Sequence, residues 1–329
     1  MSAAEPTVSV LLDPDWAGGS LVDDVRRGLG SRPLRLQPKW LYDDRGSALF
    51  DQITRLAGYY PFGAERAIFE HHAVDIAAAC DATTLVELGS GTSEKTRLLL
   101  DAFHATGRLR RFVPLDVSEG TLRQAAAELS ERYPDVAVEA VVGDFTLHLG
   151  QLPGGTDSAD RRLVAFLGGT IGNLYLEERV AFLGALADSL EPGEWLLLGT
   201  DLVKSVDRLV AAYDDPGGVT ADFARNSLVV MNRELGADFD PAAYDYVAFW
   251  DPHLQRMDLR LRAELPQRVA IPGAGLVVDV AQGEEIRVEI STKFVPEQIR
   301  SELGEAGCDV TGTWTDPDGD FALTLARRR

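Results

Sequence analysis

The residues best suited to chemistry lie in the stretch TLVELGSGTSEKTRLL, residues 84–99. Its apolar beginning predicts a strand that is buried on both faces. Gly89 and Gly91 then permit a tight turn in which the backbone comes close to a ligand. Hydroxyl residues suited to capping precede a helix that is expected to begin near Glu94. A strand, a turn and a helix in this order place a ligand at the carboxyl edge of a parallel sheet.

Glu94 separates the kinds of ligand that such a turn could bind. A phosphate-binding P-loop and a dinucleotide-binding turn both require glycine at this position, and a carboxylate there repels phosphates. S-adenosylmethionine carries a sulfonium and no phosphate, so a glutamate beside the turn does not oppose its binding. The acidic residue that such a site requires near the end of the strand is present as Glu87. An ordinary connection between a strand and a helix remains the alternative.

Two further carboxylates follow later strands of the same pattern. Asp116 ends the second expected strand, where it can accept hydrogen bonds from ribose hydroxyls. Asp144 follows the third strand, where it can accept from an adenine amino group while Phe145 packs on the ring. Lys95 lies in the first helical turn and can reach the carboxylate of a methionine moiety. Each residue could also be an ordinary turn, cap or surface residue, but acidic groups at three successive strand ends favour S-adenosylmethionine.

The elements that must position these residues alternate between strand and helix from about residue 65 onward. Strands are expected at 84–88, 111–116, 136–142, 162–167 and 195–200. This alternation predicts a doubly wound α/β sheet of the Rossmann-like class I methyltransferase type. A helix and a closing antiparallel hairpin, 308–315 with 320–326, favour that type, because a nicotinamide dehydrogenase ordinarily continues with parallel strands.

The pattern changes after Asp201 to two helices followed by antiparallel strands, which predicts an inserted α+β substrate domain. The domain organisation that we expect is an S-adenosylmethionine-binding methyltransferase domain at 61–201 and 293–329, a substrate-binding domain at 20–60 and 202–292, and a flexible lead at 1–19.

The composition excludes several classes of function. The 329 residues include 32 Lys and Arg against 52 Asp and Glu, a formal net charge of -20, which disfavours nucleic acid and membrane surfaces as partners. The two cysteines are far apart, so we expect no disulfide and a cytoplasmic location. The five histidines show no metal-ligand spacing, and no metal ion is expected. The N-terminus does not resemble a secretory signal, and we expect a monomer.

Several segments resemble one known family in colinear order from about residue 20 to the end. They are ELGSGTSEKTRLLL, FLGGTIGNL, LLLGTDLVK, WTDPDGDFALTLA, YYP and PKWLYDDRGSALFDQITRL. The sequence is similar in these segments to the histidine Nα-methyltransferases of ergothioneine biosynthesis. The resemblance implies trimethylation of the α-amino group of L-histidine by S-adenosylmethionine, with hercynine as the product.

The resemblance also assigns individual residues. The cofactor positions that it implies are Gly89, Lys95, Asp116, Asp144 and Phe145. The positions implied to hold the backbone of the amino-acid substrate are Tyr59, Asn173 and Tyr213, and the pair implied to recognise the imidazole is Glu289 and Ser291. No residue is identified as a dedicated base, although Tyr42 is expected beside the amino group and could relay its proton.

Two features depart from the family pattern. The loop 154–160 is longer than expected and polar, which indicates a surface excursion. Leu259 stands where a methionine is expected near the imidazole, an exchange that preserves apolar volume. The alternatives to histidine methylation are an N-methyltransferase for another amino acid such as tryptophan and a non-catalytic partner protein with a methyltransferase fold. A nicotinamide oxidoreductase is disfavoured by Glu94.

Overall fold

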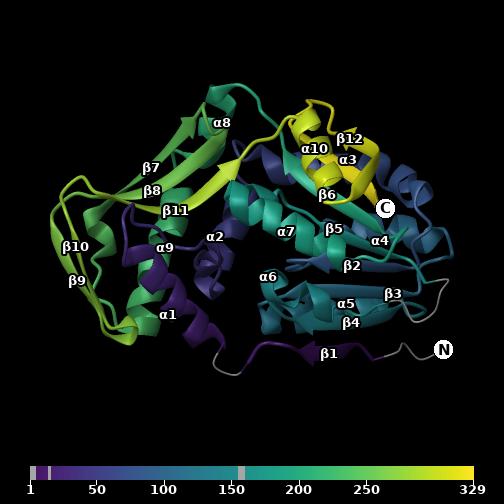
Figure 1. The fold of residues 1–329 in the computed structure, drawn as a ribbon, viewed down its shortest axis with the longest axis horizontal. Helices are drawn as coiled ribbons and strands as arrows, with labels where there is room; N and C mark the ends of the chain where they lie inside the picture. The colour runs from purple at the N-terminus through teal and green to yellow at the C-terminus, as the bar shows by residue number, and fades with distance from the viewer. Residues whose placement is uncertain (1–4, 14–15, 155–159) are drawn as a thin grey trace. The chain divides into compact units, whose positions relative to one another are not determined.

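The computed structural model describes residues 5–13, 16–154 and 160–329, which form two compact units. Unit 1 comprises Met1–Leu12, Pro61–Leu202 and Phe294–Arg329, and unit 2 comprises Asp13–Tyr60 and Val203–Lys293. Figure 1 shows helices and strands of both units with their labels. The polar loop expected at 154–160 lies for the most part outside the described residues.

Unit 1 is built on an eight-stranded sheet with the order β1-β4-β3-β2-β5-β6-β13-β12. The first six strands in this order run parallel, whereas β13 is antiparallel to β6 and to β12. Their bounds are β1 (Thr7–Val10), β2 (Thr84–Leu88), β3 (Arg111–Asp116), β4 (Ala137–Val142), β5 (Arg162–Phe166), β6 (Trp195–Asp201), β12 (Cys308–Thr315) and β13 (Phe321–Arg328). The prediction of a Rossmann-like α/β sheet with a closing antiparallel hairpin is thereby confirmed.

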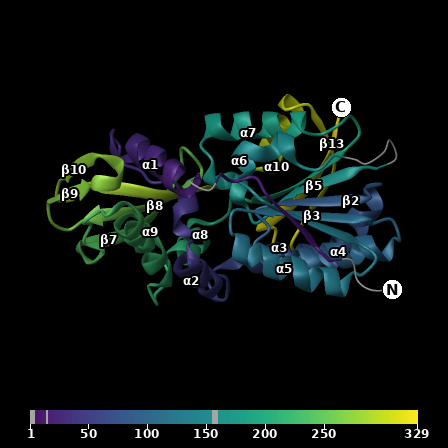
Figure 2. The same cartoon turned by 90° about the horizontal axis from the view of Figure 1, so that it is seen from below.

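Helices cover both faces of this sheet, which explains why its central strands are apolar throughout. Every residue of β2, β5 and β6 is buried. Figure 2 shows α7 and α10 on one face and α3, α4 and α5 on the other. The helices are α3 (Tyr60–Ala79), α4 (Thr96–Ala105), α5 (Glu119–Arg132), α6 (Phe145–His148), α7 (Leu176–Asp188) and α10 (Pro296–Glu305), with short 3₁₀ helices η2 (Leu149–Gln151) and η3 (Thr170–Asn173).

The N-terminal part of unit 1 differs locally from the expected elements. The flexible lead expected at 1–19 contains β1, whose residues pair in parallel with β4, and the start of the next helix. Helix α4 begins at Thr96, within two residues of the start expected near Glu94, and Ser93 in the preceding turn has a left-handed φ of 51°.

Unit 2 combines helices with two antiparallel sheets. The three-stranded sheet has the order β11-β8-β7, and β9 pairs with β10. The elements are α1 (Trp16–Leu29), η1 (Pro38–Leu41), α2 (Asp44–Thr54), α8 (Val206–Tyr213), α9 (Val219–Leu235), η4 (Pro241–Ala243), β7 (Tyr244–Asp251), β8 (Arg256–Ala263), β9 (Gln267–Ile271), η5 (Pro272–Ala274), β10 (Leu276–Val280) and β11 (Glu285–Thr292). Helices α8 and α9 pack against β7 and β8 around a common apolar core.

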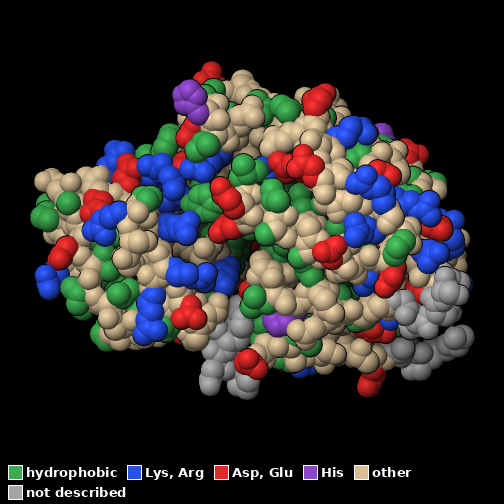
Figure 3. All heavy atoms as spheres, in the orientation of Figure 1, with side chains coloured by type: hydrophobic (Ala, Val, Ile, Leu, Met, Phe, Trp, Pro, Cys, Tyr) green, Lys and Arg blue, Asp and Glu red, His purple; other side chains and the backbone are tan. Residues whose placement is uncertain are grey.

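One face of the β11-β8-β7 sheet is apolar and the other is strongly charged. Asp258 on the charged face is fully buried and accepts hydrogen bonds from Arg260 at 2.6 Å and Arg287 at 2.8 Å. Although burial opposes ionisation, these guanidinium groups hold the pKa of Asp258 below its usual value. Figure 3 shows Lys and Arg side chains gathered over this region of unit 2. The charged side chains thus lie on one face of the sheet, and the residues of the apolar core lie on the other.

Among the helices that the described residues form, none has the length and apolar character needed to cross a bilayer.

Candidate active site

The glycine turn connects β2 to α4 at the carboxyl edge of the unit 1 sheet. Gly89 and Gly91 have φ values of 70° and 49°, a region that glycine adopts without steric cost. The backbone N–H of Gly89 donates to the carbonyl of Leu115 at 2.8 Å. A Cβ placed on Gly89 would lie 3.8 Å from the ring of Phe145. The turn and the Phe145 ring therefore border the same space, as expected for a nucleoside-binding site.

Glu87 holds this turn from inside the protein. Its carboxyl group is 4% exposed and accepts hydrogen bonds from the hydroxyls of Ser93, at 3.1 Å, and Thr96. Burial raises the pKa of Glu87 from 4.5 to about 8, despite these hydrogen bonds. Near pH 7 the Glu87 carboxyl group is therefore neutral, and it has a structural role in holding the turn.

Asp116 lies at the end of β3 beside the turn. One carboxylate oxygen accepts from the N–H of Gly91 and the other from the N–H of Ser118, both at 2.9 Å. Burial raises the pKa of Asp116, while these N–H groups oppose the shift. The structure therefore brings Asp116 and the glycine turn together, in the arrangement in which a carboxylate can also accept hydrogen bonds from ribose hydroxyls.

Asp144 and Phe145 lie at the end of the neighbouring strand β4. Asp144 Oδ1 accepts from the backbone N–H of Thr146 at 2.8 Å and from its hydroxyl at 2.6 Å, so Asp144 caps α6. The Phe145 ring packs against Phe166 and Phe182 with centroid separations of 5.1 and 5.7 Å. Both residues lie at a strand end where an adenine ring could be bound, but Asp144 also caps α6, a common role for aspartate.

Lys95 makes an ion pair that the sequence did not predict. Its Nζ donates to Oε2 of Glu65, a fully buried residue of α3. The other Glu65 oxygen accepts from the backbone N–H of Gly168 at 2.8 Å, just after β5. An ammonium has three hydrogens to donate, so Lys95 can bind Glu65 and a ligand carboxylate at the same time. Glu65 fixes the position from which it would do so.

A β-bulge in unit 2 determines which way Glu289 and Ser291 point. The register between β11 and β8 shifts between Arg287 and Glu289, after which Glu289 lies opposite Leu259 and Ser291 opposite Met257. Opposite residues of an antiparallel pair share one face, and both partners belong to the apolar core. The bulge therefore turns this polar pair toward the apolar face, where such a pair in a regular strand would more often face solvent.

Two tyrosines lie close to this pair within unit 2. The hydroxyls of Tyr213, at the end of α8, and Ser291 are 2.9 Å apart. The rings of Tyr59 and Tyr213 meet edge to face with centroids 6.2 Å apart. Gly58 permits this approach, because a Cβ there would lie only 2.7 Å from the carbonyl oxygen of Ala211. The structure thus brings Tyr59, Tyr213 and Ser291 together.

Tyr42 follows η1 and packs against the rings of Phe50 and Phe223, with centroids 5.4 and 5.3 Å away. Burial and then the negative charge of Glu289 raise the pKa of Tyr42 well above its usual value. The residue as a whole keeps 37% of its surface exposed. Tyr42 is a neutral phenol at neutral pH and is poorly suited to act as an anionic base.

Asn173 differs from the other expected substrate residues because it belongs to unit 1. It is the last residue of η3, which follows β5 at the carboxyl edge of the sheet. Within the part of the chain that the structure describes, its side chain makes no hydrogen bond, so its amide can bind a ligand. Asn173 therefore lies in the other unit from Tyr59, Tyr213, Glu289 and Ser291.

Three polar residues near the expected positions were not identified from the sequence. Tyr246 on β7 donates its hydroxyl to the carbonyl of Tyr213 at 2.7 Å, and the buried Lys293 donates to Tyr213 and Ser291. Glu65 is the third. Lys293 could have been suspected because it continues the alternation of Glu289 and Ser291, but nothing in the sequence signals the other two.

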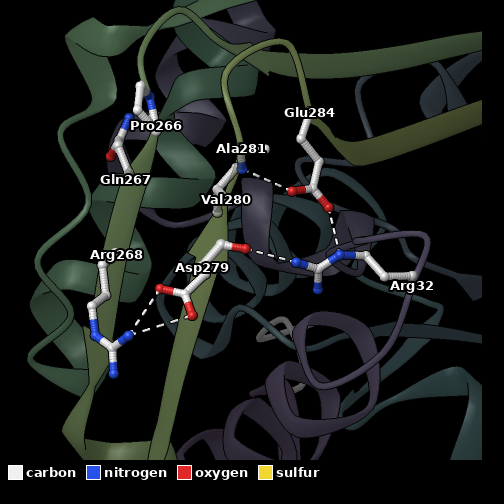
Figure 4. Close-up of a pocket in the computed structure, with 8 residues that line it drawn as sticks. All are labelled: Arg32, Pro266, Gln267, Arg268, Asp279, Val280, Ala281 and Glu284. Carbon is white, nitrogen blue, oxygen red and sulfur yellow. Dashed lines mark hydrogen bonds and ion pairs between the residues drawn. The ribbon is translucent and has the colours of Figure 1, made fainter.

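A shallow groove elsewhere in unit 2 does not contain any of these residues. Its volume is about 410 Å³. Figure 4 shows Arg32 directed toward the carbonyl of Asp279, at 2.6 Å, and toward the carboxylate of Glu284, while Arg268 pairs with the Asp279 carboxylate. Its charged groups thus bind one another, and the groove is not a candidate active site.

One group of carboxylates in the described chain is close enough to share a cation, namely Asp316, Asp318 and Asp320 in the turn before β13. Asp316 accepts backbone N–H bonds from Phe321 at 2.7 Å and from Asp318 at 3.1 Å. The Asp316 carboxylate therefore has a structural role, because it holds the turn through these backbone N–H groups.

The parallel sheet, the glycine turn with its acidic neighbours and the closing hairpin define an α/β methyltransferase. The model of one family, described as histidine-specific and S-adenosylmethionine-dependent methyltransferases, matches residues 21–328. The chain belongs to this family.

Relatives of known name agree with this assignment. A histidine N-alpha-methyltransferase of Mycolicibacterium smegmatis is 54% identical over 96% of this chain and 98% of its own length. One from Mycobacterium tuberculosis is 52% identical over 93% of this chain and 94% of its own length. Ergothioneine biosynthesis protein 1 of Schizosaccharomyces pombe is 33% identical over 65% of this chain and 29% of its own length.

Proposed function

We propose that this protein transfers three methyl groups from S-adenosylmethionine to the α-amino group of L-histidine, forming hercynine for ergothioneine biosynthesis. The observation that carries the proposal is the 54% identity to a histidine N-alpha-methyltransferase over nearly the full length of both chains. The enzyme class follows from the family, and the expected residues supply a separate chemical argument for the acceptor. We further propose that the enzyme works as a monomer in the cytoplasm without a metal ion.

The residues of unit 1 fit S-adenosylmethionine. The left-handed turn at Gly89 borders the Phe145 ring, which can pack on an adenine. Asp116 is fixed by two backbone N–H groups and can accept from the ribose, and Asp144 can accept from the adenine amino group. Lys95 is positioned by Glu65 to donate to the carboxylate of the methionine moiety. When bound, the cofactor supplies an activated methyl on a sulfonium.

The residues of unit 2 fit an imidazole with an amino-acid backbone. Glu289 and Ser291 share one face of β11, so a carboxylate and a hydroxyl can bind the two ring nitrogens. Tyr213 and Tyr59, with Asn173 of unit 1, are proposed to hold the backbone of the substrate. An indole has one donor and no acceptor, so this pair favours histidine over tryptophan.

The chemistry requires a neutral amine held in line with the methyl group. Positioning can supply much of the rate when the reacting atoms are roughly 3–3.5 Å apart. Because its pKa is raised, Tyr42 is proposed to pass the proton of the amine to water as a neutral hydroxyl, rather than to remove it as a phenolate. Binding the substrate by its ring and carboxylate leaves space at the nitrogen for successive methyl groups.

Mass spectrometry after incubation with S-adenosylmethionine and an equimolar pool of the twenty amino acids tests the proposal. We expect depletion of histidine and a product heavier by three methyl groups. Methylation of tryptophan or another amino acid instead would identify a different acceptor. A protein that binds the cofactor but methylates nothing in the pool would support the non-catalytic alternative.

A further inference from the structure

Lys293 is a buried cation to which the proposed function assigns no role. It has no exposed surface, and it follows β11 at a spacing that continues the side of Glu289 and Ser291. Its backbone N–H donates to the carbonyl of Gln255 at 2.7 Å, in the turn between β7 and β8. This bond fixes the point from which the long side chain extends into unit 2.

The Lys293 ammonium closes a triangle of polar atoms. Its Nζ donates to Tyr213 Oη and to Ser291 Oγ, each at 2.7 Å, and these two oxygens are 2.9 Å apart. The same Nζ lies 4.6 Å from the centre of the Tyr213 ring. One buried cation therefore donates to both Tyr213 and Ser291, which are proposed to bind opposite ends of the substrate.

The hydrogens in this triangle can be counted. An ammonium only donates, and each hydroxyl has a single hydrogen. One of the two hydroxyl hydrogens is used in the bond between Tyr213 and Ser291, so the other is directed out of the triangle. A hydroxyl that accepts from a cation is polarised and donates more strongly. The triangle thus presents one strengthened O–H donor, which is best matched by an anionic acceptor.

We propose that Lys293 is a positioning residue that directs the Tyr213 hydroxyl toward the carboxylate of the substrate and thereby selects α-amino acids over amines that lack a carboxylate. This inference rests on the proposed function, in which Tyr213 holds the amino-acid backbone. Lys293 acts through Tyr213 and Ser291 and does not itself contact the substrate. In this arrangement Ser291 donates to Tyr213 and accepts from one N–H of a substrate imidazole that is protonated at both nitrogens, while the Glu289 carboxylate accepts from the other N–H.

The alternative is that Lys293 only stabilises unit 2, and substrate selectivity separates the two roles. Lys293→Met keeps the length of the side chain and removes its charge and donors. We expect the KM for L-histidine to rise roughly 10- to 100-fold, the range for hydrogen bonds to charged groups, with a smaller change in kcat. The dissociation constant of histamine, which has the ring and amine but no carboxylate, should change less than about threefold on the same scale.

A double-mutant cycle with Tyr213→Phe provides a test that does not depend on histamine. If Lys293 acts through Tyr213, adding Lys293→Met to Tyr213→Phe should raise the KM for histidine by much less than it does in the wild type. The inference would be overturned if the two substitutions raised the KM for histidine by factors that multiply in the double variant. It would also be overturned if Lys293→Met weakened the binding of histidine and of histamine equally. If Lys293→Met does not fold, Lys293→Gln, which keeps donors without the charge, is measured in the same cycle.

Arg162→Met is the matched control, because it removes another buried cation, paired with Glu194 in unit 1 at 2.6 Å. It should lower the melting temperature and leave the KM for histidine unchanged. A wild-type protein that does not bind or methylate histidine would refute the proposed function. A wild-type protein that uses histidine, with an unchanged KM in Lys293→Met, would refute only the role of Lys293.

Discussion

The residues of unit 1 that are proposed to bind the methyl donor and the residues of unit 2 that are proposed to bind the acceptor are positioned by different means. In unit 1 the positioning groups belong mainly to the backbone. Gly89 and Gly91 adopt left-handed conformations, and two backbone N–H groups donate to Asp116. In unit 2 a β-bulge and contacts between side chains position Glu289, Ser291 and Tyr213. A general cofactor can thus be bound by features of the fold, whereas a particular substrate requires specific side chains.

The largest effect on affinity is expected from a substitution in unit 1 that weakens binding of the methyl donor. Asp116→Ala removes the acceptor proposed for the ribose and leaves the N–H groups of Gly91 and Ser118 without their partner. The affinity for S-adenosylmethionine should fall roughly 100-fold, because hydrogen bonds to a charged group are lost. Calorimetric titration measures this, with Asp116→Asn, which keeps one acceptor oxygen, as the milder control. A change of less than threefold in Asp116→Ala would contradict the assignment of the ribose site.

The next prediction concerns the anchor beneath the turn. Folded Glu87 keeps its proton up to about pH 8, whereas the unfolded chain loses it near 4.5. The folded state therefore binds more protons in this interval, and its stability falls as the pH rises from 4.5 to 8. Glu87→Gln removes this dependence, so its stability relative to the wild type should rise by about 4 kcal/mol between pH 5 and pH 9, the equivalent of about three pKa units.

Denaturant unfolding of both proteins across this pH range checks the prediction. Parallel curves for the two proteins would show that Glu87 ionises normally in the folded state. If Glu87→Gln changed the affinity for histidine as much as the affinity for S-adenosylmethionine, the distinction between the two sets of residues would not hold.

A smaller effect is expected at Tyr42 in unit 2. As a neutral relay that water can replace, its removal in Tyr42→Phe should reduce kcat by less than about tenfold and leave the shape of the pH–rate profile unchanged. Steady-state rates from pH 6 to pH 10 provide the measurement. A loss of several hundredfold together with the disappearance of one limb would identify Tyr42 as the base.

The smallest effect is expected at Leu259, which is 2% exposed and lies opposite Glu289. Leu259→Met restores the residue that the family resemblance led us to expect and nearly conserves volume. The KM for histidine should change by less than about threefold. A larger change, measured against an unchanged affinity for the cofactor, would show that this position tunes recognition of the ring.

The same contrast explains how much could be predicted from the sequence. The central strands and the glycine turn were predicted to within a few residues, because buried parallel strands are continuous apolar runs and turns require glycine. The bulge before Glu289 could not be predicted, because it depends on pairing with β8. Strand β1 was missed because four residues at a sheet edge have no periodic pattern.

The roles of the substrate residues came from resemblance, not from physical signals. A tyrosine such as Tyr213 looks like any core aromatic until its hydroxyl is seen 2.9 Å from that of Ser291. Glu65 was missed for the same reason, since its partner Lys95 lies thirty residues away in sequence. Contacts between distant side chains leave no local pattern, and the residue assignments in unit 2 therefore remain predictions.

The most direct test of the account is a pair of calorimetric titrations on Glu289→Ala, one with S-adenosylhomocysteine and one with L-histidine. Glu289 is proposed to bind the imidazole and has no part in the donor residues. We expect histidine affinity to fall at least about 30-fold, through loss of a charged hydrogen bond, while the cofactor product binds within twofold of the wild type. Unchanged histidine affinity in this variant would contradict the central claim that unit 2 recognises the substrate through Glu289.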